Sequence, residues 1–143
     1  MATVERNARV VWEGDLKGTG TVTGGSGALN EMPVTFASRV ENPGGKTSPE
    51  EMIASAHATC YAMAFSNVLS EKGSAPERLT VSASCYFDDG QLKITAVDLD
   101  VQGRVPGMQQ GDFESAADEA EQLCPVSNAL RGNVEIRVNA TLA

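Results

Sequence analysis

Residues Thr47–Phe65 read TSPEEMIASAHATCYAMAF and decide the fold, because they begin a long helix at a well-marked position. Thr47 or Ser48 suits the N-cap of this helix, and Pro49 suits its first turn. A stripe of side chains then recurs every three or four residues, which is the spacing of one helix face: Ile53, Ala56, His57, Cys60, Met63, Ala64, Asn67 and Val68. The pattern predicts a helix that runs to about Lys72 and is stopped by Gly73. Because this helix has few charges after Glu51 until Glu71, we expect it to be buried on most of its sides.

The residues before this helix favour strands. Two short runs of β-prone residues, Ala8–Trp12 and Val34–Val40, are separated by glycines that suit tight turns. We therefore expect a β-rich N-terminal part in which both runs are extended.

Two alternating stretches follow the helix. Leu79–Phe87 and Leu92–Ala96 place apolar residues at every second position, and Asp88–Gly90 lies between them as a turn, so the pattern predicts a β-hairpin. Beyond Ala96 the apolar positions change parity, which fits either a β-bulge or a strand buried on both faces.

The C-terminal part combines a helix and a strand. Phe113–Cys124 carries a second helical stripe that Pro125 interrupts, and Val134–Ala140 alternates as a last strand. The order of elements predicts an α+β fold in one domain spanning residues 1–143: a β-rich part, a long central helix, a hairpin, a second helix and a final strand.

Composition and charge exclude some classes of partner and cellular compartment for this chain. The 143 residues are 41% hydrophobic, which suits one domain, and the formal net charge is −8 without a basic cluster, so neither nucleic acid nor a membrane is an expected partner. The first residues lack the pattern of a secretory signal, and the odd number of cysteines, three, indicates reduced thiols or redox chemistry rather than structural disulfides. We expect a cytoplasmic protein.

Several kinds of site are disfavoured. The chain has a single histidine and no CxxC, so no zinc spacing can be assembled locally, and we expect no metal. The glycine-rich stretch at residues 18–27 lacks the order of a phosphate-binding loop, so we expect no nucleotide cofactor. Cys60 taken alone is also typical of a buried structural cysteine.

Three segments together resemble the OsmC/Ohr family of organic hydroperoxide reductases. They are TSPEEMIASAHATCYAMAF at Thr47–Phe65, EQLCPVSNAL at Glu121–Leu130 and FASRVE at Phe36–Glu41. The opening WEGDLKGTGTVTGGSG, from Trp12, is more similar to the osmotically inducible OsmC branch than to the Ohr branch. The resemblance implies an OsmC-like fold that forms an intertwined homodimer.

The resemblance also implies the site residues. The family's peroxidatic cysteine corresponds to Cys60, its resolving cysteine to Cys124, its activating arginine to Arg39 and the glutamate that holds this arginine to Glu50. No family motif covers Cys85, so we expect it to pack in the core. His57 is expected to pack or to form a hydrogen bond rather than to act on Cys60.

These four residue types make chemical sense together. A thiol attacks a peroxide only as thiolate, and a cysteine of ordinary pKa is only a few per cent ionised at pH 7. A guanidinium such as that of Arg39 would favour the charged sulfur, and a carboxylate such as that of Glu50 would hold the guanidinium bidentately.

The leading hypothesis is therefore a peroxidase that reduces organic hydroperoxides to alcohols in oxidative or osmotic stress defence. Cys60 would become a sulfenic acid, Cys124 would close a redox-active disulfide with it, and a dithiol reductant, such as a lipoylated protein, would reopen the disulfide. A redox sensor or disulfide carrier with little peroxidase turnover is the alternative. A scaffold whose cysteines only pack is the third hypothesis.

Overall fold

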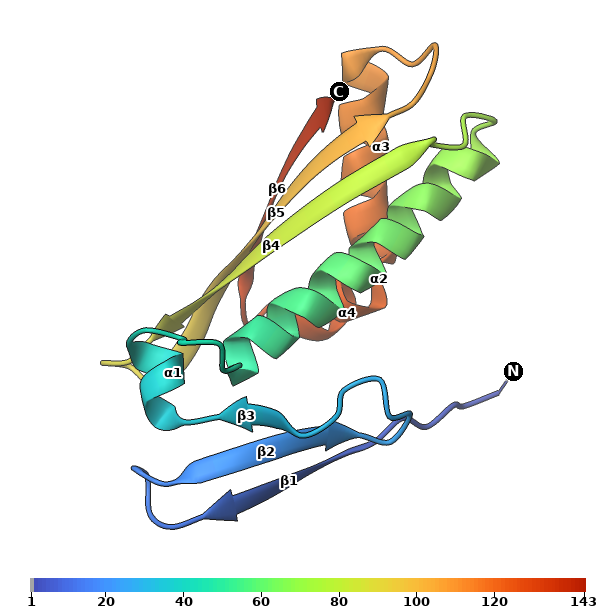
Figure 1. Cartoon of the computed structure of the whole chain (residues 1–143). Helices are drawn as coiled ribbons and strands as arrows, with labels where there is room; N and C mark the ends of the chain where they lie inside the picture. The colour runs from blue at the N-terminus through green and yellow to red at the C-terminus, as the bar shows by residue number, and fades with distance from the viewer. Residues whose placement is uncertain (1) are drawn as a thin grey trace. The chain divides into compact units, whose positions relative to one another are not determined.

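The computed structural model describes residues 2–143 and confirms the α+β class. Figure 1 shows two separate sheets and one long helix that extends the full length of the second sheet. In chain order the elements are β1 (Ala8–Glu13), β2 (Thr19–Gly24), β3 (Met32–Val34), α1 (Phe36–Val40), α2 (Pro49–Glu71), β4 (Arg78–Asp88), β5 (Lys93–Arg104), α3 (Gln110–Leu123), α4 (Pro125–Leu130) and β6 (Glu135–Leu142). The chain divides into two compact units, whose boundary falls within α2 between Met52 and Ile53.

The first unit contains the antiparallel sheet β1-β2-β3. Trp12 on β1 faces Gly20 on β2, and a Cβ atom at Gly20 would lie 2.5 Å from the indole ring. A glycine is therefore needed at this position, because the ring covers the neighbouring backbone.

A helix replaces the C-terminal part of the strand that we expected at Val34–Val40. Val34 ends β3, and the next residues turn into α1. The Thr35 hydroxyl accepts the Ser38 N–H at 3.0 Å, and the Ser38 hydroxyl accepts the Thr35 N–H at 3.0 Å. This reciprocal capping box starts a helix locally, so the strand prediction for these residues was wrong, and Arg39 lies on a helix.

The long helix begins and ends as predicted. The Ser48 hydroxyl accepts the Glu51 N–H at 3.1 Å, and Pro49 is the first helical residue. At the other end Gly73 adopts a φ of +79°, and the Ser74 N–H donates to the Leu69 carbonyl at 2.9 Å. Gly73 is suited to this left-handed position because it has no Cβ.

The second unit contains the sheet β4-β5-β6, in which β4 and β5 form the predicted hairpin. The register shifts where Tyr86 and Phe87 face Ala96 and Ile94, so that Thr95 is left over as a β-bulge. One extra residue reverses the parity of the following strand, which explains why Ile94 and Val97 both belong to the core. Of the two alternatives left open by the sequence, the bulge is the one observed.

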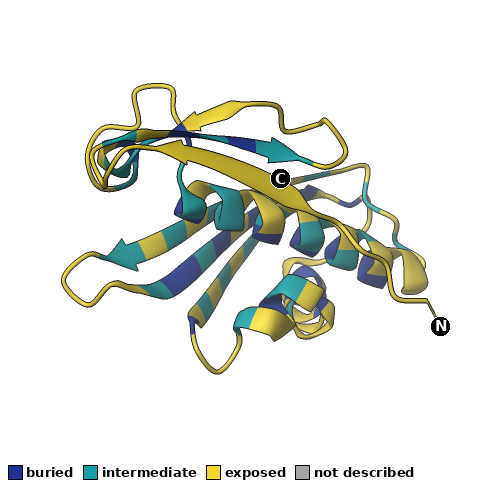
Figure 2. Cartoon of the chain, turned by 90° about the horizontal axis from the view of Figure 1, so that it is seen from below, coloured by how far each residue is buried: buried dark blue, intermediate teal, exposed yellow. Residues whose placement is uncertain are grey.

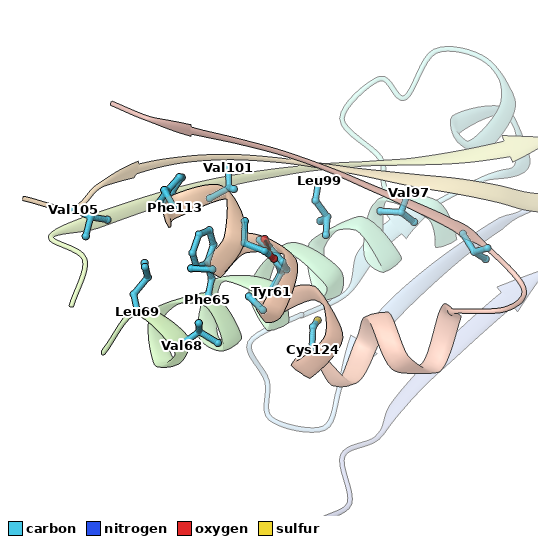
Figure 3. Close-up of a cluster of buried hydrophobic side chains, with 14 residues drawn as sticks. Tyr61, Phe65, Val68, Leu69, Val97, Leu99, Val101, Val105, Phe113 and Cys124 are labelled. Atoms are coloured by element: carbon cyan, nitrogen blue, oxygen red, sulfur yellow. Dashed lines mark hydrogen bonds between the residues drawn. The ribbon is translucent and has the colours of Figure 1, made fainter. Parts of the chain in front are cut away.

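The core of the second unit lies between its sheet and its helices. Figure 3 shows side chains from α2, β5 and α3 in this layer, among them Tyr61, Phe65, Leu99 and Phe113. Exposed residues alternate with partly buried ones along β4 and β6, and with buried ones along the second half of β5 (Figure 2), as expected for a sheet with one covered face. The Tyr61 hydroxyl donates to the Ala117 carbonyl at 2.8 Å and so joins α2 to α3.

The predicted second helix and last strand are present as α3 and β6, and β6 runs parallel to β5. A parallel neighbour requires a crossover connection, which α3 and α4 provide. Pro125 ends α3 as expected but also starts α4, a short helix that the sequence pattern did not predict.

Candidate active site

Cys60 lies in the middle of α2 and is partly buried against the core of the second unit. Cys124 is fully buried and connects α3 to α4, where its φ of −83° and ψ of 113° are extended rather than helical. The Cys124 side chain is a hydrogen-bonding neighbour of the Cys60 sulfur. Two free thiols from segments far apart in the sequence are therefore in direct contact.

The surroundings of Cys60 within its unit disfavour the thiolate. Burial raises the pKa of the Cys60 thiol, a backbone hydrogen bond from Val126 lowers it, and the neighbouring Cys124 raises it further. The net shift is upward, since removing a charge from water outweighs one N–H donor. A reactive Cys60 would need an additional positive charge.

Arg39 and Glu50 form a bidentate ion pair in the first unit. Arg39 Nε donates to Glu50 Oε1 at 2.9 Å, and a terminal guanidinium nitrogen donates to Oε2 at 2.8 Å. Glu50 is only 8% exposed, so its buried carboxylate needs a positively charged partner. The two hydrogen bonds hold the Arg39 guanidinium in one orientation. The neighbouring Glu51 is exposed and accepts a hydrogen bond from the Thr47 hydroxyl at 2.7 Å.

The structure thus arranges the four residues as two pairs. Cys60 contacts Cys124 in the second unit, and Arg39 contacts Glu50 in the first. Helix α2 contributes one member to each pair, because Glu50 lies in its first turn and Cys60 lies farther along it.

The structure contains a third polar pair, of which the sequence analysis considered only one member, His57. His57 Nε2 and Ser127 Oγ share a hydrogen bond of 2.7 Å, and both residues are completely buried. Burial lowers the pKa of His57, while Glu121 partly opposes this shift, so the ring is neutral at pH 7. The signal that could have indicated the pair is its symmetry: His57 precedes Cys60 by three residues, and Ser127 follows Cys124 by three.

An apolar groove of about 490 Å³ runs along α1 in the first unit. Its walls include Leu16, Phe36, Ala37 and Val40. The same short helix carries Arg39.

Cys85 lies on β4 and packs against the hydrophobic core, as expected. A metal ion would need several His, Cys, Asp or Glu side chains together, and residues 2–143 contain no group of three or more that could hold one. None of the helices in this described part of the chain is long and apolar enough to cross a membrane.

Sequence comparisons identify a family and two named relatives. The family described as OsmC-like protein matches residues 42–139. Peroxiredoxin OsmC of Escherichia coli (strain K12) is 37% identical over 137 residues, which cover 94% of this chain and 95% of that protein. An organic hydroperoxide resistance protein of Xanthomonas axonopodis pv. citri is 30% identical over 95 residues, which cover 65% of this chain and 66% of the relative.

Solved structures share the fold. An organic hydroperoxide resistance protein OsmC from Legionella pneumophila superposes with a TM-score of 0.73 at 23% identity, with 100% of both chains covered. An organic hydroperoxide resistance protein from Elizabethkingia anophelis gives a TM-score of 0.76 at 24% identity, again over 100% of both chains. These likenesses confirm the fold that the motifs predicted.

Proposed function

The chain belongs to the OsmC-like protein family, and on this premise we propose that it is a thiol-dependent peroxidase that reduces organic hydroperoxides to alcohols. The names of relatives support this function: one is a peroxiredoxin, and another is an organic hydroperoxide resistance protein. The observation that carries the proposal is the contact between the Cys60 and Cys124 side chains, because a peroxidatic thiol needs a second thiol within reach.

The proposed reaction has three steps. The Cys60 thiolate attacks one peroxide oxygen, so that an S–O bond forms, the O–O bond breaks, and the alkoxide takes a proton and leaves as alcohol. The Cys124 thiolate then attacks the Cys60 sulfenic acid, an S–S bond forms, and the hydroxyl leaves with a proton as water. An external dithiol reduces this disulfide and is itself oxidised to a disulfide.

Arg39 and Glu50 have a defined role in this proposal. Since the surroundings of Cys60 in its own unit raise its pKa, a fixed cation is needed to favour the thiolate at pH 7. Arg39 would supply that charge and would stabilise the leaving alkoxide, on which negative charge develops. Glu50 would keep the guanidinium oriented through the two hydrogen bonds that it accepts.

The apolar groove along α1 supports an organic substrate. Phe36 and Val40 offer hydrocarbon surface on the helix that also carries Arg39, and Leu16, from the connection between β1 and β2, lines the same groove. An alkyl or aryl group of the substrate would be removed from water there, whereas hydrogen peroxide has no such group. We therefore expect cumene hydroperoxide to be preferred to hydrogen peroxide.

The homodimer is a second part of the proposal. Contrary to the expectation that α2 is buried on most sides, its Met63 is 69% exposed within one chain. Val10, Val11 and Trp12 on β1 are also exposed. Apolar surfaces of this kind suit coverage by a second copy in an intertwined dimer.

The proposed setting is the cytoplasm, in defence against oxidative or osmotic stress. An odd number of cysteines fits a compartment that keeps thiols reduced. A dithiol reductant, such as a lipoylated protein, would complete the cycle there.

One experiment tests the central claim. Consumption of cumene hydroperoxide with a dithiol reductant is followed for wild type, Cys60→Ser and Cys124→Ser, and intact masses are taken after one equivalent of oxidant. We expect Cys60→Ser to lose all turnover and Cys124→Ser to stop at a Cys60 sulfenic acid, with Cys85→Ser as the matched control that retains activity.

Turnover that survives in Cys60→Ser would contradict the peroxidase mechanism. Rapid disulfide formation in wild type without sustained turnover would instead favour a redox sensor or disulfide carrier. If the Cys60 and Cys124 thiols remain unreacted after oxidant is added, the result would favour a scaffold whose cysteines only pack.

A further inference from the structure

His57 and Ser127 form a buried polar pair that the proposed reaction does not yet use. His57 lies on α2 one turn before Cys60, and Ser127 lies on α4 one turn after Cys124. Their hydrogen bond of 2.7 Å therefore joins the two segments that carry the reacting thiols.

The pair is poorly explained by packing alone. His57 is completely buried, and its Nδ1 has no hydrogen-bond partner among the described residues. The nearby carboxylate that affects His57 is Glu121 on α3, which is itself paired with Arg131 at 2.6 Å. A neutral ring with one unsatisfied nitrogen is less stable in a core than an apolar side chain of similar size.

The segment that His57 holds supplies two groups to Cys60. The Cys124 side chain contacts the Cys60 sulfur, and the Val126 N–H donates to it. The backbone at Cys124 leaves the helical conformation, and its N–H reaches the Glu121 carbonyl only at 3.4 Å. Ser127, by contrast, is anchored to α2 by the short bond to His57. Displacement of this segment would move both groups away from Cys60.

We propose that the His57–Ser127 hydrogen bond positions the Cys124–Ser127 segment for the resolving step, an inference that rests on the proposed peroxidase function. In that step the Cys124 sulfur forms a bond to Cys60 Sγ, the S–O bond of the sulfenic acid breaks, and the hydroxyl leaves with a proton as water. His57 and Ser127 touch neither substrate nor reacting sulfur in this step. They are positioning residues.

Four variants test the inference in single turnovers with one equivalent of cumene hydroperoxide. Ser127→Ala removes the hydroxyl, and Ser127→Thr retains it as the matched control. His57→Gln keeps a polar nitrogen near the place of Nε2. The double variant His57→Leu/Ser127→Ala removes both polar groups and so leaves neither without a partner. It therefore provides the measurement if a single variant fails to fold. Sulfenic acid is trapped with dimedone, disulfide and sulfinic acid are followed by intact mass, and thermal unfolding is measured for each variant.

We expect the ratio of the resolving rate to the first-step rate to fall at least about tenfold in Ser127→Ala and in the double variant. Trapped sulfenic acid and over-oxidised Cys60 should increase accordingly. Ser127→Thr and His57→Gln should retain most of the wild-type ratio. The double variant should melt no lower than wild type, because an apolar pair leaves no buried group unpaired.

Two results would overturn the positioning role. One is an unchanged ratio in a folded Ser127→Ala or double variant. The other is a loss of both steps in proportion to a lower melting temperature, which would make the bond merely structural. Failure of the peroxidase proposal is a distinct outcome, since wild type itself would then either form no sulfenic acid or form the disulfide without sustained turnover.

Discussion

At the scale of single residues, the burial of Cys60 works against the reactivity that we propose for its thiol. Burial raises the pKa of its thiol, and the Val126 N–H compensates only in part. The rest of the activation has to come from a permanent charge, which a guanidinium provides at any physiological pH. Arg39, held by two hydrogen bonds to a buried carboxylate, is the residue that we propose for this role.

Arg39→Ala should therefore raise the pKa of the Cys60 thiol further and lower its thiolate fraction at pH 7. We expect kcat/KM for cumene hydroperoxide to fall about 10²-fold, as for the loss of other charge-stabilising donors. The check is the pH profile of Cys60 alkylation by iodoacetamide, whose midpoint should move to higher pH.

Arg137→Ala is the matched control, because Arg137 is also ion-paired but lies on β6, where it contacts Asp98. It should leave the alkylation profile unchanged. An unchanged profile in Arg39→Ala would remove Arg39 from the site.

At the scale of elements, the position of Cys124 depends on how α3 packs against the sheet. Phe113 on α3 lies over Gly103 on β5, where a Cβ atom would come within 2.5 Å of the phenyl ring. The sheet and the helix can approach this closely only because residue 103 has no side chain. Since α3 ends next to Cys124, this contact helps to place the Cys124 side chain.

Gly103→Ala should destabilise the protein by about 1–3 kcal/mol, because the added methyl forces Phe113 or the backbone to shift. Gly111→Ala is the matched control: it lies in α3 with nothing within 4 Å of an added Cβ, and alanine is the better helix former. It should be neutral or stabilising by up to about 1 kcal/mol. Urea unfolding measures the change in the free energy of unfolding for each variant. Equal changes at the two positions would contradict the argument that Phe113 packs on Gly103.

At the scale of the whole molecule, exposed apolar side chains remain on both units. Met63 is 69% exposed in the middle of the long helix, and β1 exposes Val10 and Val11. A single exposed apolar residue is ordinary, but a mid-helix methionine together with an exposed apolar strand favours an oligomer. This is the physical basis of the proposed homodimer.

Met63→Glu should shift the protein from dimer to monomer, because a charge would be buried at the interface without a partner. Sedimentation equilibrium across a dilution series measures the change. Leu92→Glu is the matched control, since Leu92 is 76% exposed in the turn between β4 and β5 and should leave the dimer intact. A monomeric wild type would contradict the proposal.

The limits of prediction from the sequence lie in interactions that depend on context. The run Val34–Val40 has the composition of a strand, yet the Thr35 and Ser38 side chains cap a helix within it. The Thr95 bulge was one of two alternatives that parity alone could not distinguish, because both alternatives place Val97 in the core. The short helix α4 was missed because Pro125 was interpreted only as the end of a helix.

The sequence by itself determined the long helix with its caps, the α+β order of elements and the family motifs around Cys60 and Cys124. Periodicity and capping are local properties, so they can be read from neighbouring residues. The family resemblance implied the Cys60–Cys124 and Arg39–Glu50 pairs, but only the tertiary structure shows the side chains of each pair as neighbours, and it alone reveals the hydrogen bond between Ser127 and His57. These contacts join residues distant in the chain, and they arise from packing that no local pattern encodes.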